Sequence, residues 1–188
     1  MVPNQEQLMA LFSGEFITSL PHLQEKLGKV RAYVFDWDGV FNEGFKNEQG
    51  SSAFSEIDAM GVNLLRWSHY LQFQQQPLVA VISGEKNPMA VHFTEREHFH
   101  AHYFQVRHKQ DALHHFCLQH NLQPGEVFFL FDDVLDISLA AQAGLRFAVP
   151  HSSSPLFREF LLQHRHVDYL TGGSGQEHAV RESCELLM

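Results

Sequence analysis

Cysteine is scarce in this sequence, because its 188 residues include only Cys117 and Cys184, with no CxxC spacing. Two isolated thiols argue against a disulfide framework and a thiolate metal site, so free, buried or half-buried cysteines are expected. No apolar run approaches the roughly 20 residues that span a bilayer. Residues 1–7 also lack the basic start and apolar core of a signal peptide. These absences predict a cytoplasmic protein without a membrane partner.

Basic residues are also few, with 13 lysines and arginines against 22 aspartates and glutamates, which gives a formal net charge of −9. A charge of this sign repels nucleic acids and anionic membranes, so neither is expected as a partner. A small anionic substrate would therefore need a local source of positive charge, such as a metal ion, a well-placed lysine or the N-terminus of a helix.

Short apolar runs alternate with helical patterns along most of the chain. The runs cover residues 32–35, 78–82, 127–131 and 145–149, with a weaker candidate at 102–104. The helical patterns cover residues 61–73, 87–98, 110–120, 134–143 and 156–164. Continuously apolar strands separated by helices predict a parallel sheet with helices on both faces, which is a three-layer, Rossmann-like α/β fold.

The N-terminal part of the chain precedes this alternation. Residues 4–28 carry leucines and phenylalanines at helical spacing, and Pro21 is expected to open the second of two helices. We therefore assign residues 1–29 to an N-terminal helical extension and residues 30–188 to the α/β domain.

One insertion interrupts the α/β pattern. Residues 45–55 are predicted to form a β-hairpin with its turn near Gln49 and Gly50. At the other end of the domain, a flexible turn at residues 171–175 precedes a helix that is expected over residues 176–188.

Polar residues follow the predicted strands at the points where they end. They are Asp36, Asp38 and Gly39 after the first strand, Ser83 and Gly84 after the second, Lys109 after the weak strand, and Asp132, Asp133 and Asp136 after the next. The carboxyl ends of parallel strands meet at one edge of an open sheet, where such folds place their active sites. Several carboxylates at one edge require a positive partner. Mg²⁺ is the natural one, because it prefers oxygen ligands and accepts phosphate and water in its shell.

Two aspartates separated by one residue can face a single phosphorus atom from two sides. Asp36 is predicted to attack it and form an aspartyl-phosphate. Asp38 is predicted to protonate the leaving alkoxide and later to activate water. Gly39 lets the backbone turn and its amides approach phosphate oxygens. Ser83, together with Gly84, is expected to bind a phosphoryl oxygen.

The remaining polar residues are expected to balance charge. Lys109 can neutralise the charge that spreads over the phosphoryl oxygens. Asp133 and Asp136 are expected to support the metal shell or the lysine. The predicted metal ligands are Asp36, Asp38 and Asp132. Each motif alone is typical of a turn or a helix cap, but their order, each at a strand end, indicates a phosphoryl-transfer site.

These motifs resemble those of the haloacid dehalogenase superfamily. Asp36-Trp37-Asp38-Gly39-Val40 resembles its first motif, Ser83 its second, Lys109 its third, and the segment from Asp132 to Asp136 its fourth. Within that superfamily, residues 30–188 are similar to the small 3-deoxy-D-manno-octulosonate 8-phosphate phosphatases. The resemblance implies Mg²⁺-dependent hydrolysis of a sugar or sugar-acid phosphate. It also implies a homotetramer in which the hairpins assemble and a neighbouring subunit covers each site.

The spacing of the motifs indicates a domain without a cap. Only 44 residues lie between Asp38 and Ser83, and only 25 lie between Ser83 and Lys109. Neither interval can hold a folded cap beyond the hairpin and one helix, so the site would need another means of excluding water.

Two arginines common in the resembled phosphatases are replaced in this chain. Where those phosphatases commonly have Thr-Gly-Arg, this chain has Ser-Gly-Glu, so Glu85 replaces the arginine. Where they have Arg-Asp-Gly, this chain has Ile-Asp-Ala, so Ile57 replaces the arginine. Both arginines lie where a sugar-acid carboxylate could be recognised, and neither replacement can make a bidentate contact of that kind. The motifs thus predict phosphate release but leave the substrate open. A second hypothesis is a non-catalytic oligomerisation module like those of nucleotide-sugar synthetases, but the complete set of aspartates favours the enzyme.

Histidines and aromatic residues allow further interpretations. His98, His100 and His102 alternate, and a strand would place them on one face. They indicate either a transition-metal site or a polar surface strand, and the latter fits better because 14 histidines are scattered through the chain. Trp37 is expected to point into the core. The aromatic residues Phe41, Trp67, Tyr70 and Phe73 are expected in the core or in subunit contacts.

Overall fold

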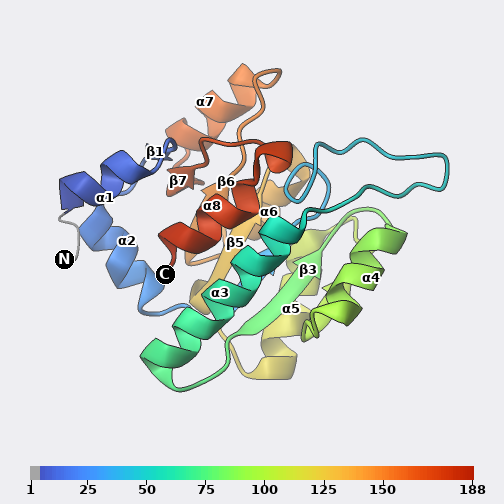
Figure 1. The fold of residues 1–188 in the computed structure, drawn as a ribbon, viewed down its shortest axis with the longest axis horizontal. Coiled ribbons are helices and arrows are strands. Elements are labelled where there is room, and N and C mark those ends of the chain that lie inside the picture. Colours follow the sequence, from blue (N-terminus) through green and yellow to red (C-terminus); the bar gives the residue numbers. More distant parts are fainter. Residues whose placement is uncertain (1–4) are drawn as a thin grey trace.

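A computed structural model describes residues 5–188, whose fold is shown in Figure 1. The strands are β1 (Glu15–Phe16), β2 (Ala32–Phe35), β3 (Leu78–Ile82), β4 (Ala101–Tyr103), β5 (Val127–Phe131), β6 (Leu145–Ala148) and β7 (Tyr169–Leu170). The helices are α1 (Gln5–Leu11), α2 (Leu20–Leu27), α3 (Glu56–Phe73), α4 (Pro88–Arg96), α5 (Lys109–His120), α6 (Ile137–Ala140), α7 (Pro155–Gln163) and α8 (Ala179–Leu186).

The seven strands form one sheet in the order β1-β7-β6-β5-β2-β3-β4. All neighbouring strands are parallel except β1, which pairs antiparallel with β7. From β2 the chain first builds the sheet toward β4 and then returns to place β5 on the other side of β2. The order therefore reverses next to β2, and this is where an open α/β sheet forms a crevice at its carboxyl edge.

Helices cover both faces of the sheet because strand side chains alternate between two apolar clusters. Tyr33 and Phe35 of β2 point into a cluster with α2, α3, α4 and α8. Ala32 and Val34 point into a second cluster with α5, α6 and α7. The central strands β2 and β5 are buried along their whole length. The predicted three-layer α/β fold is confirmed.

Among the helix starts, that of α3 differs most from the sequence prediction. The helix begins at Glu56, five residues before the predicted start at Gly61, because the side chain of Ser55 accepts a hydrogen bond from the Ile57 amide. Glu56 and Asp58 add negative charge in the first turn, which the helix dipole favours. Periodicity alone did not detect this start because the first turn is mostly polar.

The predicted N-terminal helical extension contains a strand in addition to two helices. Pro21 lies in the first turn of α2, as expected. Between α1 and α2, Glu15 pairs with Leu170 and Phe16 pairs with Tyr169, so the segment extends the sheet. Two-residue strands carry no periodic signal, and β1 and β7 were both missed for that reason. Residues 1–4 of the predicted extension lie outside the described residues.

Asp168 anchors this N-terminal segment to the sheet. Its side chain is 2% exposed and contacts Lys26 Nζ at 2.6 Å, Thr18 Oγ1 at 2.7 Å and Arg146 Nε at 3.1 Å. Its carbonyl oxygen accepts hydrogen bonds from the amides of Ile17 and Thr18. One buried carboxylate thus joins the region before α2, α2 itself and β6.

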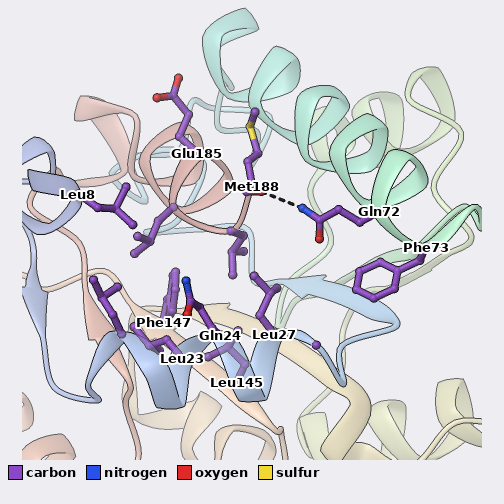
Figure 2. A pocket seen from close by; sticks show the side chains of 14 residues that line it. Leu8, Leu23, Gln24, Leu27, Gln72, Phe73, Leu145, Phe147, Glu185 and Met188 are labelled. Atoms are coloured by element: carbon purple, nitrogen blue, oxygen red, sulfur yellow. Dashed lines mark hydrogen bonds between the residues drawn. The ribbon is translucent and has the colours of Figure 1, made fainter. Parts of the chain in front are cut away.

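An apolar cavity of about 420 Å³ remains between α2, the end of α3 and α8 (Figure 2). Leucines and phenylalanines such as Leu23, Leu27 and Phe147 supply most of its wall, and Glu185 is the one charged side chain among the lining residues. Gln72 donates a hydrogen bond to the carbonyl oxygen of Met188 at its edge. The cavity lacks converging catalytic groups, so it is not a candidate active site.

The predicted hairpin segment projects from the domain as a long loop between β2 and α3 (Figure 1). The chain reverses where expected, because the Gly50 amide donates to the Asn47 carbonyl oxygen and the Asn47 amide donates to the Ser51 carbonyl oxygen. No strand is assigned between residues 36 and 55. The turn is therefore present, while the β-hairpin itself is not confirmed.

The prediction of free, buried cysteines agrees with the structure. Cys117 and Cys184 are free and buried. Across residues 5–188, none of the helices combines the length and apolar character needed to cross a membrane.

Replacing Asp168 by asparagine should destabilise the fold by about 3 kcal/mol at neutral pH, because the buried carboxylate that pairs with Lys26 and Arg146 is lost. Burial acts to raise the pKa of Asp168, but its contacts with Arg146, Lys26 and Thr18 outweigh burial and lower it. A lowered folded-state pKa means that the stabilisation is complete above the unfolded pKa of about 4 and disappears as pH falls through the folded value. Urea unfolding at several pH values would measure this loss.

The matched control for that experiment is Glu25→Gln, which removes an exposed ion pair with Lys29. Exposed pairs of this kind contribute little, so no measurable change is expected. Equal stability of Asp168→Asn and the wild type at pH 7 would contradict the anchoring role.

Candidate active site

A cavity of about 280 Å³ opens at the carboxyl edge of the sheet, where the strand order reverses. Its lining residues are Asp36, Asp38, Gly39, Glu43, Gly44, Ser83, Gly84, Glu85, Lys109, Asp132, Asp133, Leu135, Asp136 and His151. Every residue that the sequence predicts for the site is in this wall. The strand ends therefore converge as the topology requires, while the chemical role of each residue remains a prediction.

Lys109 occupies the centre of the charged groups. Its side chain is 3% exposed, and its Nζ lies 2.9 Å from Asp36 Oδ1 and 2.5 Å from Asp136 Oδ1. Burial alone would lower the pKa of Lys109, but the two carboxylates raise it above its ordinary value. The lysine is therefore a permanent ammonium that holds two buried carboxylates at fixed positions.

Lys109 reaches this position because α5 starts directly after the β4 connection. It is the first residue of α5, and its buried side chain contacts Asp36 and Asp136 at the strand ends. On the opposite side, Asp36 follows β2, and its amide donates to the carbonyl oxygen of Leu130 in β5. The central pair of strands thus fixes the Asp36 backbone.

Asp132 has one oxygen with a partner and one without. His151 Nε2 lies 2.9 Å from Asp132 Oδ2, whereas the buried Oδ1 accepts no hydrogen bond. Burial raises the pKa of Asp132 to about 6, the His151 hydrogen bond acts in the opposite direction, and the charge of Asp36 raises it further. A bound cation would relieve both the missing partner and the repulsion.

Oxygen atoms from Asp36, Asp132 and Asp136 lie within 4.8 Å of one another. A set of carboxylate oxygens suits a hard divalent cation such as Mg²⁺. The two oxygens of Asp136 already contact Lys109 and the Asp133 amide. Asp36 and Asp132 are therefore the better side-chain ligands, and Asp136 positions the lysine.

Gly39 meets two requirements at once. Its φ is +84°, which side chains rarely tolerate, and a Cβ atom at this position would lie 1.8 Å from Asp132 Oδ2. The backbone of the first motif and the side chain of the fourth motif can approach each other only because residue 39 has no side chain.

Asp38 lies in a separate polar network. Its Oδ1 accepts from Ser52 Oγ at 2.8 Å and from Asn87 Nδ2 at 3.4 Å, while Oδ2 pairs with Lys46 Nζ at 3.1 Å. Trp37, buried as predicted, donates to the same serine. The Asp38 carboxylate is thus not part of the acidic cluster, and the metal role predicted for it stays a prediction.

Sequence reasoning missed several residues of the site. His151 follows β6, two residues after a strand prediction that extended to residue 149, and its place after a strand end is the signal that could have found it. Ser52 and Asn87 carry no such signal, because a loop and a helix cap bring them to Asp38. Their contribution depends on tertiary contacts.

The two residues that replace arginines, Glu85 and Ile57, lie in different places relative to the cavity. Glu85 lines the cavity, whereas Ile57 lies on α3, is 49% exposed and does not line it. The chain therefore offers no cation at either position near the cavity.

The alternating histidines do not share a metal site. His98 has a positive φ and precedes β4, so it leaves the strand pattern. The Nδ1 of His100 accepts from the Val79 amide, and that of His102 contacts Thr94 Oγ1. Within residues 5–188, the acidic cluster is the group found with metal-ligand geometry.

No family model matches the chain, but individual proteins do. The 3-deoxy-D-manno-octulosonate 8-phosphate phosphatase of Yersinia pestis is 29% identical over 168 residues, which are 87% of this chain and 82% of that protein. The corresponding enzyme of Salmonella typhimurium is 26% identical over 173 residues, covering 89% and 84% of the two chains.

Solved structures agree with the sequence matches. A crystal structure of the Yersinia pestis phosphatase has a TM-score of 0.72 at 28% identity and covers 88% of this chain and 84% of that one. A subfamily III A hydrolase of the haloacid dehalogenase superfamily from Legionella pneumophila has a TM-score of 0.74 at 28% identity, with 89% and 87% covered. The chain is thus a homologue of the 3-deoxy-D-manno-octulosonate 8-phosphate phosphatases, which are phosphoric monoester hydrolases of the haloacid dehalogenase superfamily.

Proposed function

We propose that this protein is a Mg²⁺-dependent phosphatase that hydrolyses a small phosphomonoester through an aspartyl-phosphate. The observation that carries the proposal is the buried group of Asp36, Lys109 and Asp132 at the strand ends, with one Asp132 oxygen lacking a partner. A bound cation at this position would supply the contact that the buried acceptor lacks.

In the first step, an oxygen of Asp36 attacks phosphorus, and the bond from phosphorus to the ester oxygen breaks. Lys109 orients the Asp36 carboxylate, and its charge balances the phosphoryl group. Asp38 donates a proton to the leaving alkoxide, and its contact with Ser52 holds the carboxyl group in place for this task.

In the second step, Asp38 takes a proton from water, and the hydroxide attacks phosphorus to release inorganic phosphate and regenerate Asp36. Ser83, which is buried in the cavity wall, and Gly84 would hold phosphoryl oxygens during both steps. Asp36 and Asp132 would hold Mg²⁺, and the ion would neutralise charge on the phosphoryl oxygens.

The substrate class follows from the relatives rather than from the cavity. They are named for 3-deoxy-D-manno-octulosonate 8-phosphate, which makes a sugar or sugar-acid phosphate the leading candidate. A structure from Moraxella catarrhalis, 22% identical, contains magnesium, phosphate and the sugar acid, and at this identity it supports the fold alone. Glu85 in the cavity wall offers no cation for a carboxylate.

The cellular location and the oligomeric state of the enzyme are also part of the proposal. We expect a cytoplasmic homotetramer in which the loop at residues 45–55 assembles and a neighbouring subunit covers the open cavity. Phe45 at the base of this loop is 81% exposed, which supports a contact there. The complete set of charged site residues favours this enzyme over a non-catalytic oligomerisation module.

Replacing Asp36 by asparagine should lower the rate of phosphate release by on the order of 10⁴-fold or more, because the amide is a poor nucleophile. Release of p-nitrophenol from p-nitrophenyl phosphate, and of phosphate from a panel of sugar and sugar-acid phosphates, would measure the loss with Mg²⁺ supplied. The control is Asp111→Asn, since Asp111 lies on α5, is exposed and does not line the cavity. A folded wild type that is inactive on the whole panel would refute the proposal.

Adding Mg²⁺ should raise the melting temperature of the wild type, since a ligand at 100 times its Kd stabilises the folded state by about 2.7 kcal/mol. Asp132→Asn should lose most of this shift, because it replaces a carboxylate ligand by an amide, whereas Asp111→Asn should keep it. Calorimetric titration with Mg²⁺ would give the affinities directly. Equal Mg²⁺ affinity in Asp132→Asn and the wild type would exclude Asp132 as a ligand.

A further inference from the structure

Ser52 lies at the centre of a buried hydrogen-bond network beside Asp38, the proposed acid and base. Its hydroxyl oxygen is 3.1 Å from Trp37 Nε1, 2.6 Å from Asn87 Nδ2 and 2.8 Å from Asp38 Oδ1. Trp37 and Asn87 are fully buried, and Ser52 is 2% exposed. Solvent does not reach these three side chains, so the protein itself sets the direction of each hydrogen bond.

The side-chain amide of Asn87 can adopt only one of its two orientations. Asn87 is the N-cap of α4, and its Oδ1 accepts hydrogen bonds from the amides of Met89 and Ala90. A reversed side chain would point its NH2 group at two N–H donors and leave them without an acceptor. The start of α4 therefore turns Nδ2 toward Ser52, and Asn87 can only donate to the serine.

Two donors occupy the acceptor sites of the Ser52 hydroxyl oxygen. A hydroxyl group has two lone pairs and one hydrogen. The indole N–H of Trp37 takes one lone pair and the amide N–H of Asn87 takes the other. Neither of these nitrogens can accept a hydrogen bond in return. The hydrogen of the Ser52 hydroxyl is thus directed to Asp38 Oδ1.

The two oxygens of Asp38 are consequently not equivalent. Oδ1 accepts from Ser52 and, at 3.4 Å, from Asn87 Nδ2, and both donors are buried. A proton on Oδ1 would be opposed by both donors, so a protonated Asp38 carries its proton on Oδ2. Oδ2 contacts Lys46, whose side chain is 30% exposed and belongs to the loop at residues 45–55. A substrate oxygen can replace that exposed contact without breaking the buried network.

We propose that Ser52, oriented by Asn87 and Trp37, is a positioning residue that assigns proton transfer to Oδ2 of Asp38. The inference rests on the proposed phosphatase reaction and adds the atom through which the proton passes. While the bond from phosphorus to the ester oxygen breaks, the proton on Oδ2 passes to that oxygen. Oδ2 later takes a proton from the water whose oxygen bonds to phosphorus, as the bond from phosphorus to Asp36 breaks.

The nature of the leaving group decides how much a substrate depends on this network. The alkoxide of a sugar phosphate needs a proton as it leaves, whereas p-nitrophenolate is stable enough to leave without one. Loss of the network should therefore slow the cleavage of a sugar phosphate far more than that of p-nitrophenyl phosphate. A variant whose fold was merely loosened would slow both substrates by similar factors.

Ser52→Ala tests the proposal, because alanine removes the hydroxyl group and adds no atoms to the site. With the sugar phosphate that the wild type hydrolyses fastest, kcat/KM should fall about 100-fold, which is the lower end of what a positioned general acid contributes. With p-nitrophenyl phosphate, the fall should be less than about 5-fold, since its leaving group needs no proton. The quantity kcat/KM is suitable because it reports transition-state stabilisation relative to the free enzyme and substrate.

Two further variants separate positioning from a loss of folding. Ser52→Thr keeps a hydroxyl group and should recover most of the kcat/KM lost with the sugar phosphate. Asn87→Ser keeps a strong N-cap for α4 but removes the amide donor, so it should also slow the sugar phosphate more than p-nitrophenyl phosphate. The matched control is Asn121→Ser at the exposed C-cap of α5, outside the cavity wall, which should behave like the wild type with both substrates. Circular dichroism would establish that all variants are folded.

The two substrates also distinguish failure of this inference from failure of the proposed function. A folded Ser52→Ala variant that loses the same factor with both substrates, or that keeps the wild-type kcat/KM with the sugar phosphate, would overturn the positioning role. Either result leaves the phosphatase reaction itself standing. A folded wild type that is inactive on every substrate would overturn the phosphatase reaction and the positioning role together.

Discussion

The ammonium group of Lys109, held between two buried carboxylates, is the interaction on which the site depends. Without it, the carboxyl groups of Asp36 and Asp136 would lie at the buried end of the sheet with no cation between them. With it, both carboxyl groups have a cationic partner. The cost of burying three charged groups is offset because each has a partner within 3 Å. Lys109 does not serve Asp132 in this way. Asp132 Oδ1 is buried without a hydrogen-bond partner, and a bound cation would supply one.

Polar groups also join segments that the apolar core alone would leave loose. Asp168 connects the N-terminal segment to β6, and Asp38 connects the loop at residues 45–55 to the N-terminus of α4 through Ser52 and Asn87. In both cases one carboxylate receives several donors from distant parts of the sequence. The first contact stabilises the fold, and the second positions a residue to which we assign proton transfer.

The fold class and most of the site could be predicted because both depend on local patterns. The central strands are apolar over their whole length, and a polar residue directly after such a strand must lie at the edge of the sheet. Asp36, Ser83, Lys109 and Asp132 were found in this way. The strands β1 and β7 were missed because two residues are too few for a pattern. The early start of α3 was missed because a serine cap, rather than periodicity, determines it.

The sequence by itself determined which residues reach the carboxyl edge of the sheet, since strand ends and helix starts are local properties. Only the tertiary structure decided which side chains of the site contact one another. It paired Asp136 with Lys109, placed His151 against Asp132, and turned the Asp38 carboxylate toward Ser52 and Lys46. Such choices depend on distances between segments far apart in the chain, and side-chain type and spacing do not contain those distances. The same is true of Gly39. The sequence shows the glycine, but only the structure shows that Asp132 Oδ2 leaves no room for a side chain there.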